Sequence, residues 1–240
     1  MTRLFLPFTL ALLIGCNQHP KQQTANLPPR SDSPKTITDS AGSDSLPHSA
    51  AKDDAYNDNM PVNLPPGLAT FLPKGYEALD TSGGDINRDS LRDMILICRT
   101  KDRDSLDIET PGPRPLLILT GQPDGSFKLA ARNDNVVLCR TCGGAMGDPY
   151  QQTVIKKGYF SLEYYGGAAE RWSRIVTFKY VTADNDWRLH KISEDSYNCT
   201  EEDPKHTINT WSEKDLGTIP FTKYNSDTIY NLLTSKLSAK

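Results

Sequence analysis

The apolar residues of this chain fall into short runs that are bounded by polar residues, glycine or proline. Residues 94–98 (MILIC) and 116–119 (LLIL) are two such runs. They are too short for ordinary helices and are typical of strands that are buried on both faces. Residues 171–181 instead alternate between polar and apolar, the pattern of a strand with one buried face. The chain is therefore expected to be mainly β.

Tight turns separate these runs. Asp124-Gly125 supplies the positive φ that a hairpin turn needs, and it joins residues 116–119 to residues 127–131. Further turn signals lie at residues 156–158 and 183–186. Short connections place consecutive strands side by side and antiparallel. The pattern predicts an antiparallel meander that forms a two-sheet or incomplete-propeller domain.

Only the C-terminal segment has a helical pattern. Ser226 is an N-cap residue for a helix over residues 227–237. The apolar residues that recur at helical spacing on one face are Ile229, Leu232, Leu233 and Leu237. We expect this helix to cover one end or edge of the sheet, because an exposed strand edge invites pairing with other chains.

The first 16 residues have the pattern of a bacterial lipoprotein signal. An Arg-bearing start is followed by an apolar run over residues 4–15, which is too short to span a bilayer core. The run ends in LIGC at residues 13–16, the pattern of a lipobox. It predicts a cleaved leader at 1–16, a lipid anchor on Cys16, and a membrane-attached protein of the bacterial cell envelope that faces the periplasm. The alternatives are an ordinary secretory leader and a buried N-terminal helix.

Residues 17–63 are predicted to be a disordered tether. They are polar and almost lack aromatic and branched apolar residues, so burial could not offset their ordering entropy. Residues 64–240 are then expected to form a single β-rich domain. The 27 Lys and Arg are scattered among 30 Asp and Glu, without a basic patch interleaved with aromatic residues. Nucleic acid is therefore not an expected partner, whereas the membrane and another envelope protein or glycan are.

One short segment has a metal-binding pattern. Residues 85–93 (DINRDSLRD) lead directly into the run 94–98 and carry oxygen-bearing side chains at positions 1, 3, 5 and 9. A hard cation such as Ca²⁺ takes about six to eight oxygen ligands. The predicted ligands are the side chains of Asp85, Asn87 and Asp89, the backbone carbonyl of Leu91, and Asp93 directly or through water. The alternative is a loop that keeps its shape through Asx-type hydrogen bonds without metal.

This segment resembles the calcium loops of the FG-GAP and VCBS repeats of integrin-like β-propellers, whose pattern is Asp-x-Asn-x-Asp-Gly-x-x-Asp before a strand. The resemblance covers about residues 75–131 and implies a structural calcium site. Ser90 stands where the family has glycine, and a Ser at positive φ costs on the order of 1 kcal/mol. The chain is too short for a closed propeller. More loosely, the domain resembles uncharacterised bacterial lipoproteins, which implies no activity.

Four cysteines follow Cys16, and all are disulfide candidates because the exported face of a bacterial membrane is oxidising. They are Cys98, Cys139, Cys142 and Cys199. Sequence alone leaves their three pairings open. Cys139 and Cys142 have the spacing of a redox dithiol, but a strand-like run precedes them and two glycines follow, whereas redox chemistry needs a helix N-terminus. A structural disulfide is favoured, and a thiol-redox lipoprotein is the alternative.

An aromatic segment suggests a ligand surface. Its residues, which could stack on sugars or peptides, are Tyr164, Tyr165, Arg171 and Trp172. Ordinary cross-strand packing of the aromatic residues, with the Arg reaching outward, is the favoured interpretation. The favoured function is a membrane-anchored envelope lipoprotein with a β-rich binding or structural domain that calcium stabilises. A cell-wall or glycan hydrolase, with carboxylates that the fold brings together, is another hypothesis. Glu163 and Glu170 are one conceivable pair, whose separation the sequence does not set.

Overall fold

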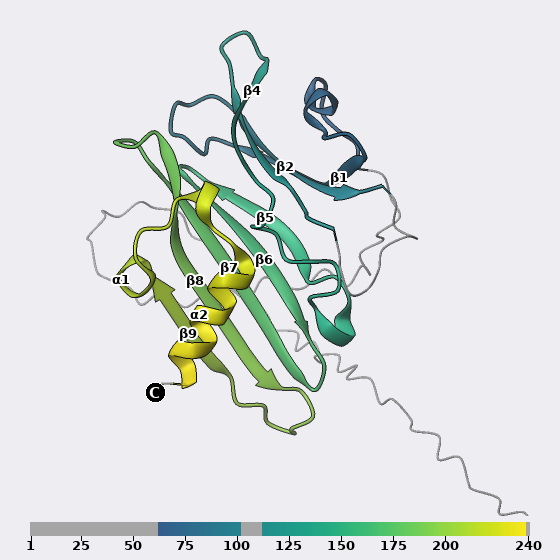
Figure 1. Cartoon of the computed structure of the whole chain (residues 1–240), viewed down its shortest axis with the longest axis vertical. Helices are drawn as coiled ribbons and strands as arrows, with labels where there is room; N and C mark the ends of the chain where they lie inside the picture. Colours follow the sequence, from purple (N-terminus) through teal and green to yellow (C-terminus); the bar gives the residue numbers. More distant parts are fainter. Residues whose placement is uncertain (1–61, 102–111, 239–240) are drawn as a thin grey trace, which may run out of the picture. The chain divides into compact units, whose positions relative to one another are not determined.

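The computed structural model describes residues 62–101 and 112–238. The predicted leader, Cys16 and the predicted tether up to residue 61 lie outside these residues. The described part contains two antiparallel sheets and a C-terminal helix (Figure 1). The predicted fold class, mainly β with two sheets and a C-terminal helix, is confirmed. Val62 and Leu64 already pack against the core, so the fold begins at or before the predicted boundary at residue 64.

Sheet 1 has four strands, and its two central strands are buried on both faces. Its strands, in spatial order, are β1 (Tyr76–Gly84), β2 (Asp93–Thr100), β3 (Leu116–Gly121) and β4 (Phe127–Asn133). One face packs against the other sheet through residues such as Ile95 and Ile118. The opposite face, which includes Leu96 and Leu117, is covered by the segment that contains the short 3-10 helix η1 (Leu68–Phe71). Two-sided burial explains why β2 and β3 are continuous apolar runs.

Sheet 2 has five strands and a different burial pattern. In spatial order they are β5 (Tyr150–Lys156), β6 (Tyr159–Gly167), β7 (Glu170–Val181), β8 (Asp186–Asn198) and β9 (Thr207–Ser212). Buried residues alternate with half-buried ones along β6 and β7. Successive side chains of a strand point to opposite faces, so this alternation means that one face is packed and the other is open.

The remaining elements are short apart from the last helix. They are η2 (Gly144–Met146), α1 (Glu213–Leu216), η3 (Phe221–Lys223) and α2 (Ser226–Ser238). The packed face of sheet 2 meets sheet 1, η3 and α2 in one core. Phe160 and Phe178 stack at 5.0 Å between ring centroids, and the Phe221 ring meets both edge-on. The aromatic cluster therefore joins sheet 2 to the C-terminal segment.

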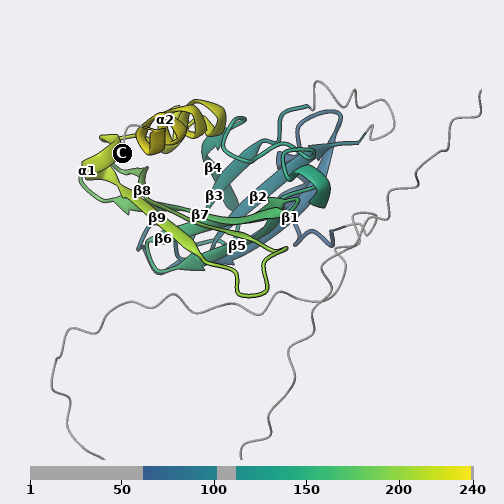
Figure 2. The same ribbon diagram turned by 90° about the horizontal axis from the view of Figure 1, so that it is seen from below.

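Helix α2 lies on the same side of sheet 2 as sheet 1 (Figure 2). It covers a face of the sheet, not an end or edge as the sequence suggested. Ile229 and Leu233 are buried, but Leu232 and Leu237 are each more than a third exposed. The N-cap is Asn225, since its Oδ1 accepts hydrogen bonds from the amides of Asp227 and Thr228. The predicted cap at Ser226 was therefore one residue too late.

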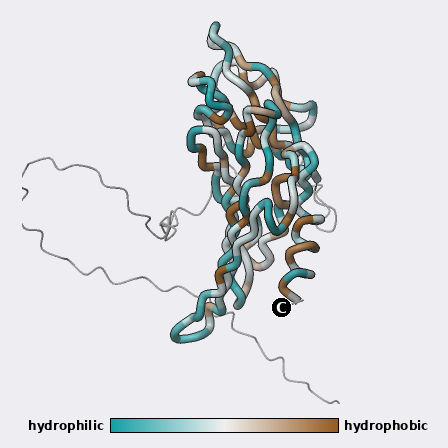
Figure 3. Tube along the Cα trace, turned by 90° about the vertical axis from the view of Figure 1, so that its left-hand side faces the viewer, coloured by the Kyte–Doolittle hydropathy of each residue, from teal (hydrophilic) through white to brown (hydrophobic). Residues whose placement is uncertain are grey.

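The other side of sheet 2, which we call the open face, carries no covering element among the described residues (Figure 2). The loop between β8 and β9, lowest in Figure 3, is coloured hydrophilic. Within residues 62–101 and 112–238, no helix has both the length and the apolar character needed to cross a membrane.

Candidate functional site

The loop between β1 and β2 brings three carboxylates together. Oxygen atoms of Asp85, Asp89 and Asp93 all lie within 4.8 Å of one another. The loop is held against sheet 2 through its backbone. The Asp85 carbonyl accepts a hydrogen bond from the amide of Gly158 (3.0 Å), and the Ile86 carbonyl accepts one from the indole Nε1 of Trp187 (3.0 Å).

Asx-type hydrogen bonds shape the middle of the loop. Asn87 Oδ1 accepts from the amide of Asp89 (3.0 Å), and Asp89 Oδ1 accepts from the amide of Leu91 (2.7 Å). The amide of Ser90 donates to Asp85 Oδ2 at 3.3 Å. These are the bonds that the metal-free alternative requires. They also point the predicted ligand residues toward one another, so the loop has a defined shape before any ion is considered.

Two residues of the loop adopt left-handed backbone conformations. Arg88 has φ 67° and Ser90 has φ 71°. Ser90 therefore makes the backbone turn for which the resembled family uses glycine. The strain expected of Ser90 is present, and the turn forms in spite of it.

Asp93 is the buried member of the carboxylate cluster, with none of its surface exposed. Its Oδ2 accepts from the amide of Ile86 and its Oδ1 from the amide of Gly121, both at 2.9 Å. Burial raises the pKa of Asp93, and the charges of Asp89 and Asp85 add to the increase, while the two backbone hydrogen bonds oppose it. The cluster therefore crowds negative charge around a carboxylate that water does not reach.

Asp85 has one carboxylate oxygen that is buried without a hydrogen-bond partner, Oδ1. Its other oxygen, Oδ2, has Lys157 Nζ at 3.9 Å, but that lysine side chain is 68 % exposed. A buried carboxylate oxygen with no donor is costly, and a cation is one partner that would relieve the cost. The arrangement is chemically suited to a hard cation with oxygen ligands.

The cysteines separate into three places. Cys139 and Cys142 form a disulfide in the turn after β4, with their Cα atoms 5.1 Å apart. Cys98 is a fully buried thiol of β2, and burial raises its pKa to about 12. The Sγ of Cys199 lies 3.8 Å from the carbonyl oxygen of Ala168, at the far end of sheet 2. The Cys139–Cys142 pair sits in a turn and not at the start of a long helix, since η2, which follows it, has three residues.

The four residues of the predicted ligand surface do not lie on one face. Tyr165 and Arg171 belong to the open face of sheet 2. Tyr164 is 2 % exposed in the core, where its hydroxyl donates to the carbonyl of Val136. Trp172 pairs with Gly166 on the packed side of the sheet. Neighbouring residues of a strand point to opposite faces, so Tyr164 and Trp172 lie on the packed side of the sheet, as the cross-strand packing alternative expects, and the four residues do not form one surface.

The two glutamates proposed as a hydrolase pair are also apart. Glu163 pairs with Ile175 across the strands, so Glu170 is five residues away along β7, which is about 17 Å at strand rise. Glu163 accepts a hydrogen bond from Gln152 on the open face. Glycosidase carboxyl pairs are about 5 to 10 Å apart, so these two residues do not form one.

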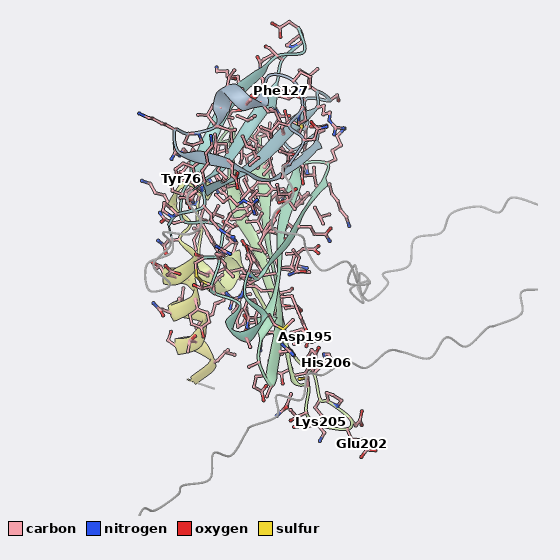
Figure 4. All side chains as sticks on the ribbon, turned by 90° about the vertical axis from the view of Figure 1, so that its right-hand side faces the viewer. Tyr76, Phe127, Asp195, Glu202, Lys205 and His206 are labelled. Atoms are coloured by element: carbon pink, nitrogen blue, oxygen red, sulfur yellow. A yellow bond between two sulfur atoms is a disulfide. The ribbon has the colours of Figure 1, made fainter. Side chains whose placement is uncertain are left out.

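A polar cluster that the sequence did not predict lies at the lower end of the open face, where Figure 4 shows Asp195 beside His206. His206 Nδ1 is 2.7 Å from Asp195 Oδ2, and the His206 ring stacks on Tyr197 with centroids 4.5 Å apart. Tyr197 and Tyr165 share a hydroxyl contact of 3.4 Å. The β8–β9 loop separates Asp195 from His206 in sequence, so only the pairing of β8 with β9 reveals the cluster.

Comparisons with known proteins were made at three levels. No protein-family model, no curated protein and no solved structure matches this chain. The β1–β2 loop is therefore interpreted from its own geometry.

Proposed function

We propose that this chain is a lipid-anchored protein of the bacterial cell envelope whose β domain is stabilised by a calcium ion in the β1–β2 loop. The main support for a calcium site is the Oδ1 atom of Asp85, which is buried without a hydrogen-bond partner beside the oxygens of Asp89 and Asp93. The lipid anchor is supported by the pattern of residues 1–16 and by Cys16.

The residues that would hold the ion are the five predicted from the sequence. They are Asp85, Asn87, Asp89, Leu91 through its carbonyl, and Asp93. A bound calcium ion would offset the charge of three clustered carboxylates and give Asp85 Oδ1 a partner. Among the described residues, the cation that lies near Asp85 is Lys157, whose Nζ stands 3.9 Å from Oδ2 and whose side chain is mostly in solvent.

The position of the loop gives the ion a structural role. The loop connects β1 to β2 of sheet 1 and hydrogen-bonds through Asp85 and Ile86 to Gly158 and Trp187 of sheet 2. A ligand that binds only the folded state stabilises that state in proportion to the logarithm of its concentration. Calcium is therefore expected to strengthen the contact between the two sheets.

Thermal unfolding of the purified chain in EDTA and in excess calcium tests this proposal. We expect calcium to raise the unfolding free energy, by about 2.7 kcal/mol at a hundredfold excess over its Kd. Asp85→Asn should remove most of the increase. Asp203→Asn, which makes the same charge change in the exposed β8–β9 loop, should keep it. An unchanged midpoint in the unmodified chain would refute the calcium site, whatever the variants do.

The anchor is tested separately, by cell fractionation. Cys16→Ser is expected to move the protein from the membrane fraction to the soluble fraction, because the thiol that carries the lipid is gone. Retention of the variant in the membrane fraction would contradict a lipid anchor at Cys16 and would leave the calcium result unaffected.

A further inference from the structure

A row of basic side chains crosses the open face of sheet 2 near the β7–β8 turn. Lys156 pairs with Tyr159 on the neighbouring strand, Tyr159 with Lys179, and Lys179 with Arg188. Four strands at about 4.8 Å spacing make the row about 14 Å long. We call Lys156, Tyr159, Lys179 and Arg188, together with Arg88 and His190 beside them, the basic row.

The basic row is centred on the ring of Tyr159. The guanidinium carbon of Arg88 lies 5.8 Å from the ring centroid, and Lys179 Nζ lies 5.9 Å from it. The His190 ring meets the Tyr159 ring edge-on at 5.4 Å. Arg88 reaches this position from the β1–β2 loop, so the row collects residues from five separate segments of the chain.

Several of the cations in the row are not held in ion pairs. Arg188 pairs with Asp184, but Arg88, Lys156 and Lys179 form no ion pair within the described parts of the chain. Lys179 and Arg188 also stand directly opposite each other, and like charges in that position destabilise a sheet. An anion placed over the row would relieve this repulsion.

We propose that the basic row binds an anionic polysaccharide, a sugar chain that carries sulfate, phosphate or carboxylate groups. The cations would contact the anionic groups, and the Tyr159 ring holds Arg88 and Lys179 close together on the face where the sugar chain would lie. This function goes beyond the calcium site, and the tested lysines, Lys156 and Lys179, belong to sheet 2 and not to the β1–β2 loop.

The rest of the open face favours a narrow polymer over a lipid surface. Glu163 and Asp195 lie on the same face, in other rows of the sheet. An anionic bilayer laid against the whole face would meet these carboxylates as well as the cations. A single chain that follows the row would meet Arg88, Lys156 and Lys179, which have no ion-pair partner in the described parts of the chain, and would avoid Glu163 and Asp195. Charge complementarity therefore fits the linear polymer better than a bilayer.

Binding of the full chain to dextran sulfate, with uncharged dextran as the ligand control, tests the proposal. Each Lys or Arg facing an anionic surface contributes about a fivefold change in affinity, so Lys156→Gln/Lys179→Gln should weaken binding about 25-fold. Binding should also fall as salt is raised. Lys128→Gln/Lys205→Gln removes the same charge from exposed positions outside the row and should leave binding within about twofold.

Three outcomes would overturn the proposal. The first is equal weakening by the two double variants, which would mean that only net charge matters. The second is no binding of dextran sulfate by the unmodified chain. The third is row-dependent binding of phosphatidylglycerol vesicles or DNA without binding of dextran sulfate, which would assign the row to a different partner.

The His190 ring gives an independent readout. Partial burial lowers its pKa, and the charges of Lys179 and Lys191 lower it further, against an opposing contribution from Glu213. A polyanion bound over the row should raise the His190 pKa, as followed by NMR during a pH titration. A structural role of the lysines alone would leave that pKa unchanged when dextran sulfate is added.

Discussion

Sheet 1 and sheet 2 are both antiparallel, but they bury their strands differently. In β2 every residue except the last is buried, because sheet 2 covers one face of sheet 1 and the segment with η1 covers the other. In β7 buried and half-buried residues alternate, because only one face is packed. The two central strands of sheet 1, β2 and β3, are covered on both faces and offer no open surface to a ligand. The singly covered sheet presents an open face with the basic row at one end and the Asp195–His206 cluster at the other.

The difference suggests a division of roles between the sheets. Sheet 1 and the core between the sheets should supply most of the stability, whereas residues of the open face should be replaceable with little loss of fold. The β1–β2 loop lies where the two regions meet, since it leaves sheet 1 and hydrogen-bonds to sheet 2.

Breaking the buried ion pair near the disulfide turn should have the largest effect. Arg114, which is 4 % exposed, donates through Nη1 to Asp148 Oδ1 at 2.8 Å and to the carbonyl of Leu138. Arg114→Met would leave Asp148, whose side chain is only 15 % exposed, without its cation and should cost about 3 kcal/mol in urea unfolding. The exposed pair of Arg132 with Asp134 is the control, and Arg132→Met should cost less than about 1 kcal/mol. Equal costs would mean that burial does not set the strength of these pairs.

A matched pair of truncations tests the two sheets directly. Leu96 is fully buried between sheet 1 and the segment that contains η1. Leu96→Ala should cost about 2–5 kcal/mol because it leaves a cavity. Val154 lies on the open face of sheet 2, where Val154→Ala should cost less than about 1 kcal/mol. Urea unfolding of both variants gives the comparison. A large cost at Val154 would show that the open face is covered by something that stabilises the fold.

The sequence predicted the strands with strong patterns and missed those without them. The apolar run 94–98 lies within β2, and the alternating run 171–181 lies within β7. Strands β1 and β9 were not predicted. β1 has mixed polarity and an irregular register at Ala78, and β9 is an edge strand whose Ile208 is 63 % exposed. Edge strands need little burial, so their sequences carry little of the pattern that marks a strand.

Closeness in sequence correctly predicted which residues share a site in the β1–β2 loop, but it failed to do so in the strands. Asp85, Asp89 and Asp93 meet because one tight loop holds them. Tyr164 and Tyr165 are adjacent in sequence but point to opposite faces of the sheet. Lys156 and Lys179 are far apart in sequence and become close only through strand register, which the sequence does not specify.

The smallest expected effect concerns Ser90 in the β1–β2 loop, which lies where the two sheets meet. Ser90 holds φ 71°, a conformation that glycine adopts without strain, so Ser90→Gly should raise the unfolding free energy by about 1 kcal/mol. Ser173 lies in the extended strand β7, where Ser173→Gly should instead lower it by about 0.5–1 kcal/mol. Opposite signs in thermal unfolding would show that backbone conformation decides the effect. A decrease in the unfolding free energy of Ser90→Gly would mean that the Ser90 side chain stabilises the loop by more than the backbone strain costs.

If Ser90→Gly also tightens calcium binding, then the strain at Ser90 limits the affinity of the loop for the ion.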